Sequence, residues 1–268
     1  MTERETGLSA GVSRCLRRRA GRLPTKRART LLLTAAGLIL CAGVTGYLFQ
    51  TGRLLLNNPP SDRYPIRGVD VSSYQGTIDW DMIRAQNIRF AFVKATEGSS
   101  LTDPRFHANY EDATKAGLRV GAYHFFSYDT GGVAQADHFA GVVAKTDNML
   151  PPVIDLEFYG DYAKYPLPKE QVVPQLEAFV QKVKDTYGVS PIIYATQKSY
   201  GLYIQGGFAD CDIWIRNVYS TPSLPDGRAW TFWQYADKAT LKGYAGAETH
   251  IDMNVFAGTE AEFEGYGK

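Results

Sequence analysis

Two carboxylates stand two residues apart in the stretch PPVIDLEF (Pro151–Phe158), as Asp155 and Glu157. In a β-strand, side chains two residues apart point to the same face, so both acids would share one small region. Neighbouring carboxylates resist ionising together, which keeps one of them protonated near neutral pH. The pair therefore predicts a general acid beside a charged partner. An ordinary strand end with solvated acids has the same pattern, so the rest of the chain must decide.

Two further acids lie at the ends of predicted strands. Asp70 is near the end of the predicted strand Ile66–Ser72, and Asp252 lies in the apolar run His250–Phe256. An acid within an apolar run needs a partner or a function. Aromatic residues are enriched at the same strand ends, namely Tyr74, Tyr123, Phe125, Phe126, Phe158, Tyr194, Trp214, Trp233 and Tyr235. Carboxylates among aromatic rings are typical of a carbohydrate cleft, although buried aromatics also build ordinary cores.

The elements that must position these side chains alternate along the chain. Predicted strands are Ile66–Ser72, Ile88–Ala95, Leu118–Phe126, Pro152–Glu157 and Pro191–Thr196, and predicted helices between them are Ile78–Gln86, Arg105–Ala116, Gly132–Val143 and Glu170–Tyr187. Such alternation indicates an α/β fold with a parallel sheet, either doubly wound or closed as a barrel. Later predicted strands, Ile213–Val218, Trp230–Tyr235 and His250–Phe256, are separated by Pro, Gly and Asp without a clear helix. We therefore expect an irregular, TIM-like (β/α) barrel that lacks helices in its last third. Catalytic groups of such barrels come from the C-terminal ends of the strands.

Several other chemistries have no support in the sequence. No glycine-rich phosphate loop follows the first predicted strand, and no G-x-S-x-G motif is present. The four histidines are scattered without metal-ligand spacing, so we expect neither a metal nor a cofactor. Cys211 is the one cysteine of the predicted globular part, which excludes an internal disulfide there.

The N-terminal part predicts a membrane segment. Leu31–Phe49 is uncharged, and many arginines precede it. This run can span a bilayer, and the positive-inside rule keeps the N-terminus in the cytoplasm. We predict a basic cytoplasmic segment at 1–30, an anchor at 31–49, a linker at 50–65 and the barrel at 66–268. The barrel would then lie outside the cytoplasm, in the periplasm or at the cell surface. The alternative is secretion after cleavage of a signal peptide near Ala42.

The charge is distributed unevenly. Residues 1–61 hold ten lysines and arginines against two acids, whereas the rest of the chain has 19 basic and 26 acidic residues. An acidic body argues against a nucleic-acid partner. We expect a monomer.

Several stretches, in order along about residues 66–258, resemble the family 25 glycoside hydrolases, the Chalaropsis-type lysozymes. They are GVDVSSYQGTIDW (Gly68–Trp80), FVKATEGSS (Phe92–Ser100), GAYHF (Gly121–Phe125), the acid pair in PPVIDLEF, IIYAT (Ile192–Thr196), WQY (Trp233–Tyr235) and IDMNVF (Ile251–Phe256). Because the match is collinear, it is far more specific than any single motif. One departure is Arg216, which follows Trp214 and Ile215 where the family usually has a small residue.

The resemblance implies an N-acetylmuramidase that cuts the β-1,4 bond between N-acetylmuramic acid and N-acetylglucosamine in peptidoglycan. It implies that Glu157 is the general acid and Asp155 the acid beside it, and that Asp70 and Asp252 are the two further acids of the site. The predicted substrate contacts are Tyr123, Tyr194 and Gln234, with Trp214 and Tyr74. One alternative is a glycan-binding protein that keeps the fold without turnover. Another is a chitinase-like barrel enzyme, against which the Asp70 and Asp252 motifs argue.

The stereochemistry follows less directly from the sequence. Retaining enzymes place their two carboxyl groups about 5–5.5 Å apart, and inverting enzymes roughly 6.5–9.5 Å apart. Side chains of residues i and i+2 in a strand lie roughly 6.5–7 Å apart on one face. This distance falls between the carboxyl separations of the two classes of enzyme. Peptidoglycan sugars also carry an acetamido group that can attack the anomeric carbon. We therefore expect net retention by substrate assistance, with Glu157 as acid and then base, and Asp155 polarising the amide.

Overall fold

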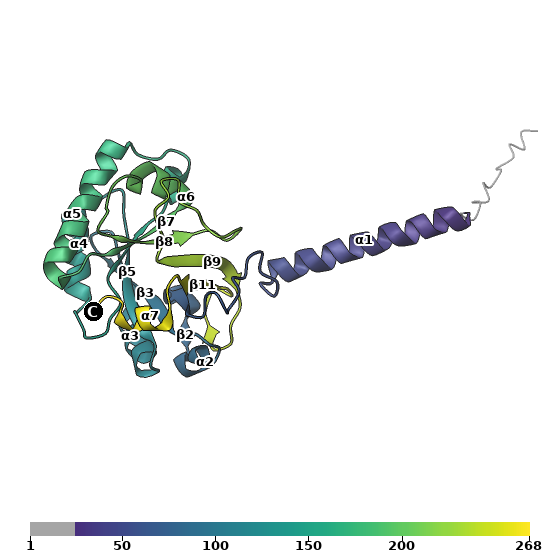
Figure 1. The fold of residues 1–268 in the computed structure, drawn as a ribbon, viewed down its shortest axis with the longest axis horizontal. Coiled ribbons are helices and arrows are strands. Elements are labelled where there is room, and N and C mark those ends of the chain that lie inside the picture. The colour runs from purple at the N-terminus through teal and green to yellow at the C-terminus, as the bar shows by residue number, and fades with distance from the viewer. Residues whose placement is uncertain (1–24) are drawn as a thin grey trace, which may run out of the picture. The chain divides into compact units, whose positions relative to one another are not determined.

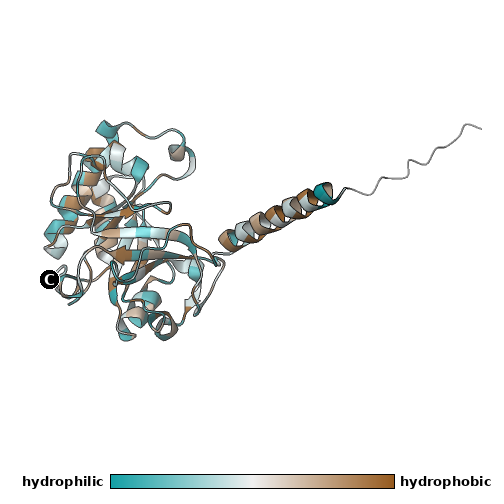
Figure 2. Cartoon of the chain, turned by 45° about the vertical axis from the view of Figure 1, so that its right-hand side comes forward, coloured by the Kyte–Doolittle hydropathy of each residue, from teal (hydrophilic) through white to brown (hydrophobic). Residues whose placement is uncertain are grey.

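The computed structural model describes residues 25–268, and the chain divides into two units after Val44. Helix α1 (Lys26–Gln50) has no buried residue and is apolar along most of its length, as Figure 2 shows by colour. A helix of this length and hydropathy can cross a membrane, and a signal sequence near an N-terminus has the same properties. Residues 1–24 of the basic segment predicted at 1–30 lie outside the described residues.

Eight strands form a closed ring in the second unit (Figure 1). They are β1 (Arg67–Val71), β3 (Phe90–Glu97), β5 (Arg119–Phe125), β6 (Val153–Leu156), β7 (Ile192–Thr196), β8 (Asp212–Arg216), β9 (Phe232–Ala239) and β11 (Ile251–Phe256). Their order around the ring is β1, β11, β9, β8, β7, β6, β5 and β3, and β3 pairs again with β1. All neighbours are parallel except β11, which is antiparallel to both β1 and β9. The predicted TIM-like barrel is confirmed.

Helices cover the outside of the ring (Figure 1). They are α2 (Trp80–Arg84), α3 (Phe106–Lys115), α4 (Gly132–Val142), α5 (Lys169–Tyr187), α6 (Gln197–Ser199) and α7 (Glu260–Gly265), with the short turns η1 (Ser73–Gln75), η2 (Gly160–Ala163) and η3 (Tyr200–Ile204). The small strands β2 (Thr77–Ile78) and β10 (Tyr244–Ala245) pair with each other, and β4 (Leu101–Thr102) pairs with β3. The stretch from β8 to β11, which the structure describes completely, contains no helix, as predicted.

The longest barrel helix shows how the sequence forms these elements. In α5, the apolar residues Val172, Leu176, Phe179 and Val183 recur at helical spacing and are buried. The helix ends at Gly188, whose φ of 74° lies in the left-handed region that glycine adopts without strain. The apolar stripe therefore holds the helix against the outside of the barrel.

Aromatic rings fill the inside of the barrel below the mouth. Phe92 stacks on Trp214 with ring centroids 4.5 Å apart, and Phe90 lies 5.3 Å from Phe232. A β-carbon at Gly68 would lie 2.3 Å from the Phe90 ring, so only glycine leaves room for that ring. Because these rings close the interior, the barrel is open to a ligand only at its mouth.

The predicted linker, residues 50–65, begins with the last residue of α1, and residues 51–65 contain no helix or strand and pack on the barrel. Tyr64 is buried, with its ring centroid 5.9 Å from those of both Trp230 and Trp233. The Arg67 guanidinium donates to Asn58 Oδ1 at 3.1 Å. The segment is therefore fixed to the barrel over these residues.

Candidate active site

The C-terminal ends of the parallel strands form the mouth of the barrel, together with the N-terminal end of β11. Because β11 runs against its neighbours, Asp252 near its start pairs in register with Asp70 near the end of β1. Asp155 lies on β6, which ends at Leu156. Glu157 directly follows the end of this strand. The four acids line one cleft of about 280 Å³.

The same cleft brings together all nine residues that the sequence predicted for the site. They are Asp70, Tyr74, Tyr123, Asp155, Glu157, Tyr194, Trp214, Gln234 and Asp252. They come from seven strands, from the residue that follows β6 and from the turn η1 after β1. The individual roles that we assigned to them remain predictions.

Asp70 is held by amide donors. Gln234 Nε2 lies 3.2 and 3.0 Å from its two carboxylate oxygens, and Asn254 Nδ2 lies 2.7 Å from Oδ2. Burial raises the pKa of Asp70, and these donors oppose the rise. Burial and the charge of Asp70 raise the pKa of Asp252 well above its usual range. A proton shared by the two acids therefore belongs on Asp252, and Asp70 keeps the negative charge.

Asp155 differs from Asp70 and Asp252, which both accept a hydrogen bond from Gln234 Nε2. It is buried, and its Oδ1 has no hydrogen-bond partner among the described residues. Burial and then the charges of Glu157 and Asp70 raise its pKa well above the usual range. A buried carboxylate oxygen without a donor is costly, and a native structure that keeps one has a reason for it. Asp155 Oδ1 can therefore accept a hydrogen bond from an N–H group of a bound ligand.

Glu157 lies in the same region and is only partly buried. Burial raises its pKa, and the positive charge of Arg216 opposes the rise. Asp155 and Glu157 therefore hold a proton between them at higher pH than isolated acids would. This is the condition that general-acid chemistry near neutral pH requires.

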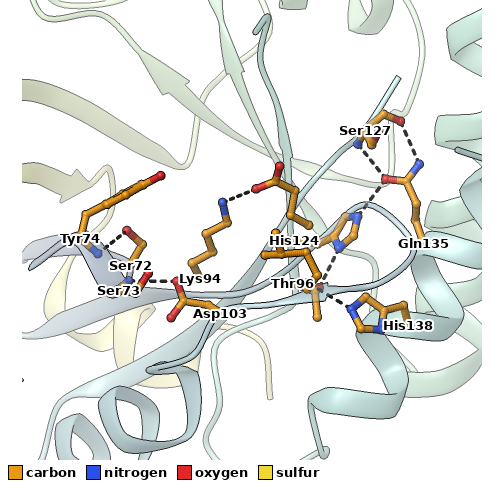
Figure 3. Close-up of polar contacts among 12 residues, drawn as sticks. Ser72, Ser73, Tyr74, Lys94, Thr96, Asp103, His124, Ser127, Gln135 and His138 are labelled. Atoms are coloured by element: carbon orange, nitrogen blue, oxygen red, sulfur yellow. Dashed lines mark hydrogen bonds and ion pairs between the residues drawn. The ribbon is translucent and has the colours of Figure 1, made fainter. Parts of the chain in front are cut away.

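Two cations at the mouth were not predicted as site residues. Lys94 on β3 lines the cleft, and its Nζ lies 2.6 Å from Glu97 Oε2, an ion pair drawn as the dashed line from Lys94 in Figure 3. The same Nζ lies 4.8 Å from the Phe125 ring centroid. Arg216 on β8 forms an ion pair with Asp237. The sequence contained a signal for Lys94. It is a charged residue in an apolar run, and its spacing of two residues from Phe92 and four from Phe90 places it on the same, inward face of the strand. Arg216 was noticed only as a departure from the family pattern.

A β-bulge next to Lys94 determines which side chains of β3 point to the mouth. The pairing of β3 with β5 shifts register between Lys94 and Thr96, which turns Thr96 away from the mouth. Thr96 Oγ1 lies 2.7 Å from His124 Nδ1, and His124 Nε2 lies 3.0 Å from Gln135 Oε1 (Figure 3). Gln135 Nε2 in turn donates to the backbone oxygen of Ser127 at 2.9 Å. This buried chain of side chains holds the loop after β5 beside the mouth.

The predicted substrate contacts differ in exposure. Tyr194 and Trp214 are buried and form the floor of the cleft, whereas Tyr74 is 67% exposed at the rim. The Tyr194 hydroxyl donates to Gln234 Oε1 at 2.9 Å, which fixes the Gln234 amide so that its Nε2 faces the acids. The rim tyrosine is therefore the ring most open to a sugar face.

The model of the family described as glycosyl hydrolases family 25 matches residues 69–244 of this chain. Among solved structures, a family 25 glycosyl hydrolase from Bacillus anthracis is 50% identical, with a TM-score of 0.75. The alignment covers 78% of this chain and 97% of the Bacillus chain.

Two relatives have named activities. Lysozyme M1 of Streptomyces globisporus is 34% identical over 212 residues, which are 75% of this chain and 71% of the lysozyme. The N,O-diacetylmuramidase of Chalaropsis sp. is 30% identical over 205 residues, which are 71% of this chain and 95% of that enzyme.

Proposed function

The chain belongs to family 25 of the glycosyl hydrolases, and from that membership we propose how it acts on its substrate. It is a peptidoglycan hydrolase of the lysozyme type. Our proposal is that it cleaves the β-1,4 bond after N-acetylmuramic acid with net retention, using the substrate's own acetamido group. The observation that carries this proposal is the buried, unpartnered Oδ1 of Asp155 beside Glu157.

An acetamido N–H of the bound sugar supplies the donor that Asp155 lacks. A hydrogen bond to the charged form of a carboxyl lowers its pKa, so substrate binding favours ionised Asp155. The proton that the two acids share then belongs on Glu157, which is the more exposed of the pair. Binding therefore places the proton on the general acid and the negative charge beside the amide.

The reaction has two steps. In the first, Glu157 gives its proton to the leaving glycosidic oxygen while the acetamido carbonyl oxygen attacks the anomeric carbon and forms a cyclic oxazolinium ion. Asp155 stabilises the positive charge that develops on the amide. In the second step, the Glu157 carboxylate takes a proton from water as the water attacks the anomeric carbon and opens the ring. Two inversions give net retention.

Clearing of purified peptidoglycan by the full chain in detergent micelles tests the activity, with mass spectrometry of the released fragments. We expect fragments that end in reducing N-acetylmuramic acid. Binding without clearing would instead support the glycan-binding alternative.

Proton NMR of the first-formed product tests the stereochemistry, and we expect the β anomer. An early excess of the α anomer would rule out retention. Substrates with one, two or three fluorines on the acetyl group then separate assistance from attack by Asp155. Fluorine weakens the carbonyl nucleophile, so the rate should fall steeply along the series, whereas a rate independent of fluorine would exclude assistance.

The location of the enzyme follows from its substrate and from α1. Peptidoglycan lies outside the cytoplasmic membrane, so the barrel works there. We propose that α1 is an uncleaved anchor around residues 31–49 and that residues 66–268 form the catalytic domain. The length of α1 and its uncharged run support this arrangement.

A further inference from the structure

Exposed apolar side chains gather beside the active-site cleft, on the segment that follows α1. Leu54, Leu56 and Tyr219 are 42%, 62% and 76% exposed. The two leucines and the tyrosine line one groove, and Asp237 lines both that groove and the active-site cleft. The patch of Leu54, Leu56 and Tyr219 therefore lies at the rim of the catalytic mouth.

The segment that carries the leucines is fixed where it leaves α1. The amides of Arg53 and Leu54 donate to the Leu48 carbonyl in the last turn of α1, at 3.0 and 3.1 Å. Gly52 is buried with a φ of 66°, and a β-carbon there would lie 1.8 Å from the Lys238 backbone oxygen. Only glycine permits so close an approach. Leu54 therefore lies at the level where α1 ends, and the backbone beside it rests on β9.

A bilayer surface fits this patch. The uncharged run of α1 ends at Phe49, five residues before Leu54. Each headgroup layer beyond the hydrocarbon is roughly 5–7 Å thick, so residues held at the end of α1 fall within it. Tyrosine and leucine suit that layer, and the exposed Arg53 and Lys238 suit anionic headgroups.

We propose that Leu54, Leu56 and Tyr219, flanked by Arg53 and Lys238, form a membrane-contact surface that holds the rim of the catalytic mouth at the outer face of the bilayer. The inference rests on the anchor proposed above. Its consequence is a limited reach, because the fixed segment gives the barrel no slack. The enzyme acts on glycan next to the membrane, which includes strands still attached to lipid.

Spin labels on the full chain in vesicles test the contact. The vesicles contain equal parts of phosphatidylglycerol and phosphatidylethanolamine. Cys15→Ser and Cys41→Ser leave Cys211 as the one native thiol, and Cys211 is buried. A nitroxide at Leu56→Cys should collide more with oxygen dissolved in lipid than with an aqueous nickel chelate. The matched control is Asp147→Cys, in the exposed loop before β6 at the opposite end of the barrel, where nickel collisions should dominate.

Three results would overturn the proposal. The first is a label at Leu56→Cys that is as accessible to nickel as the control. The second is protection from both reagents that disappears on dilution, which would assign the patch to a second copy of this chain. The third result applies if the chain is found in a shortened, soluble form, which by itself contradicts only the proposed anchor. If this soluble form also does not float with the same vesicles, the membrane-contact surface is contradicted as well.

A double variant tests the consequence for substrate. Leu54→Glu with Leu56→Glu should leave hydrolysis of soluble glycan unchanged, because neither leucine lines the cleft. Hydrolysis of glycan linked to lipid in the same vesicles should fall about tenfold or more as the effective concentration is lost. An equal rate on both substrates would contradict the limited reach.

Discussion

At the scale of single residues, the activity depends on which acid holds the proton. Glu157→Gln keeps the shape of the side chain and removes the proton donor. We expect the variant to fold and bind glycan but to lose about 10²–10⁴ in rate. Clearing of peptidoglycan and glycan pull-down measure the two properties separately. Glu170→Gln, at the exposed start of α5, is the control and should be fully active. Unchanged turnover of Glu157→Gln would remove this residue from the mechanism.

Asp155 should lower the stability of the fold at neutral pH. The pKa of Asp155 in the folded state is raised well above the usual 3.8. At pH values between 3.8 and this raised pKa, the folded state binds more protons than the unfolded state. The free energy of unfolding therefore falls as pH rises through this window. Asp155→Asn removes the buried charge, and we expect it to stabilise the protein by about 1–3 kcal/mol at pH 8 while activity is lost.

The pH dependence separates this effect from simple repacking. The gain from Asp155→Asn should shrink as pH falls through this window and level off below 3.8, where the wild-type acid is protonated in both states. Denaturant unfolding at several pH values measures it. The exposed Asp161→Asn is the control and should show no such trend. A gain that is equal at all pH values would contradict the assignment of a buried charge.

At the scale of elements, the bulge in β3 is stabilised by a neutral histidine. Burial lowers the pKa of His124 to about 3, from an ordinary 6.5. The unfolded state therefore binds more protons between these values, and the stabilising contribution of neutral His124 is lost as pH falls from 6.5 toward 3. At higher pH the ring links Thr96 to Gln135 and so holds the loop after β5.

His124→Leu should accordingly be destabilising near pH 7.5, because it leaves Thr96 and Gln135 without their partner. The difference from wild type should shrink on the acid side, by at most about 1.4 kcal/mol per pH unit. Urea unfolding at pH 7.5 and pH 5 measures both values, and the exposed His107→Gln serves as control. A constant difference would show that His124 does not titrate between the two states in this range.

At the scale of the whole molecule, the proposed anchor predicts a topology. A reporter fused after Lys268 should be active only outside the cytoplasm, because the basic residues before Leu31 stay inside. The full chain should also remain in membranes after a carbonate wash. Release of a shortened soluble form would show instead that α1 is a signal peptide that is cut.

Much of the barrel and of its acids was predictable from local pattern. Strand and helix periods each depend on a few neighbouring residues, so the alternation along 66–196 predicted a parallel sheet, either doubly wound or closed as a barrel. The positions of Asp70, Asp155 and Glu157 at strand ends then placed them at one mouth, because parallel strands end on the same side. All nine predicted site residues line that cleft.

Tertiary structure alone decided the rest. The reversed direction of β11 pairs the start of that strand with the end of β1, and so brings Asp252 to Asp70. The bulge in β3 directs Lys94 and Thr96 to opposite sides, and Gly52 brings the segment after α1 onto β9. Burial leaves Asp155 Oδ1 without a donor among residues 25–268. Each of these features depends on register and burial between residues far apart in the chain, which no local pattern of side chains encodes.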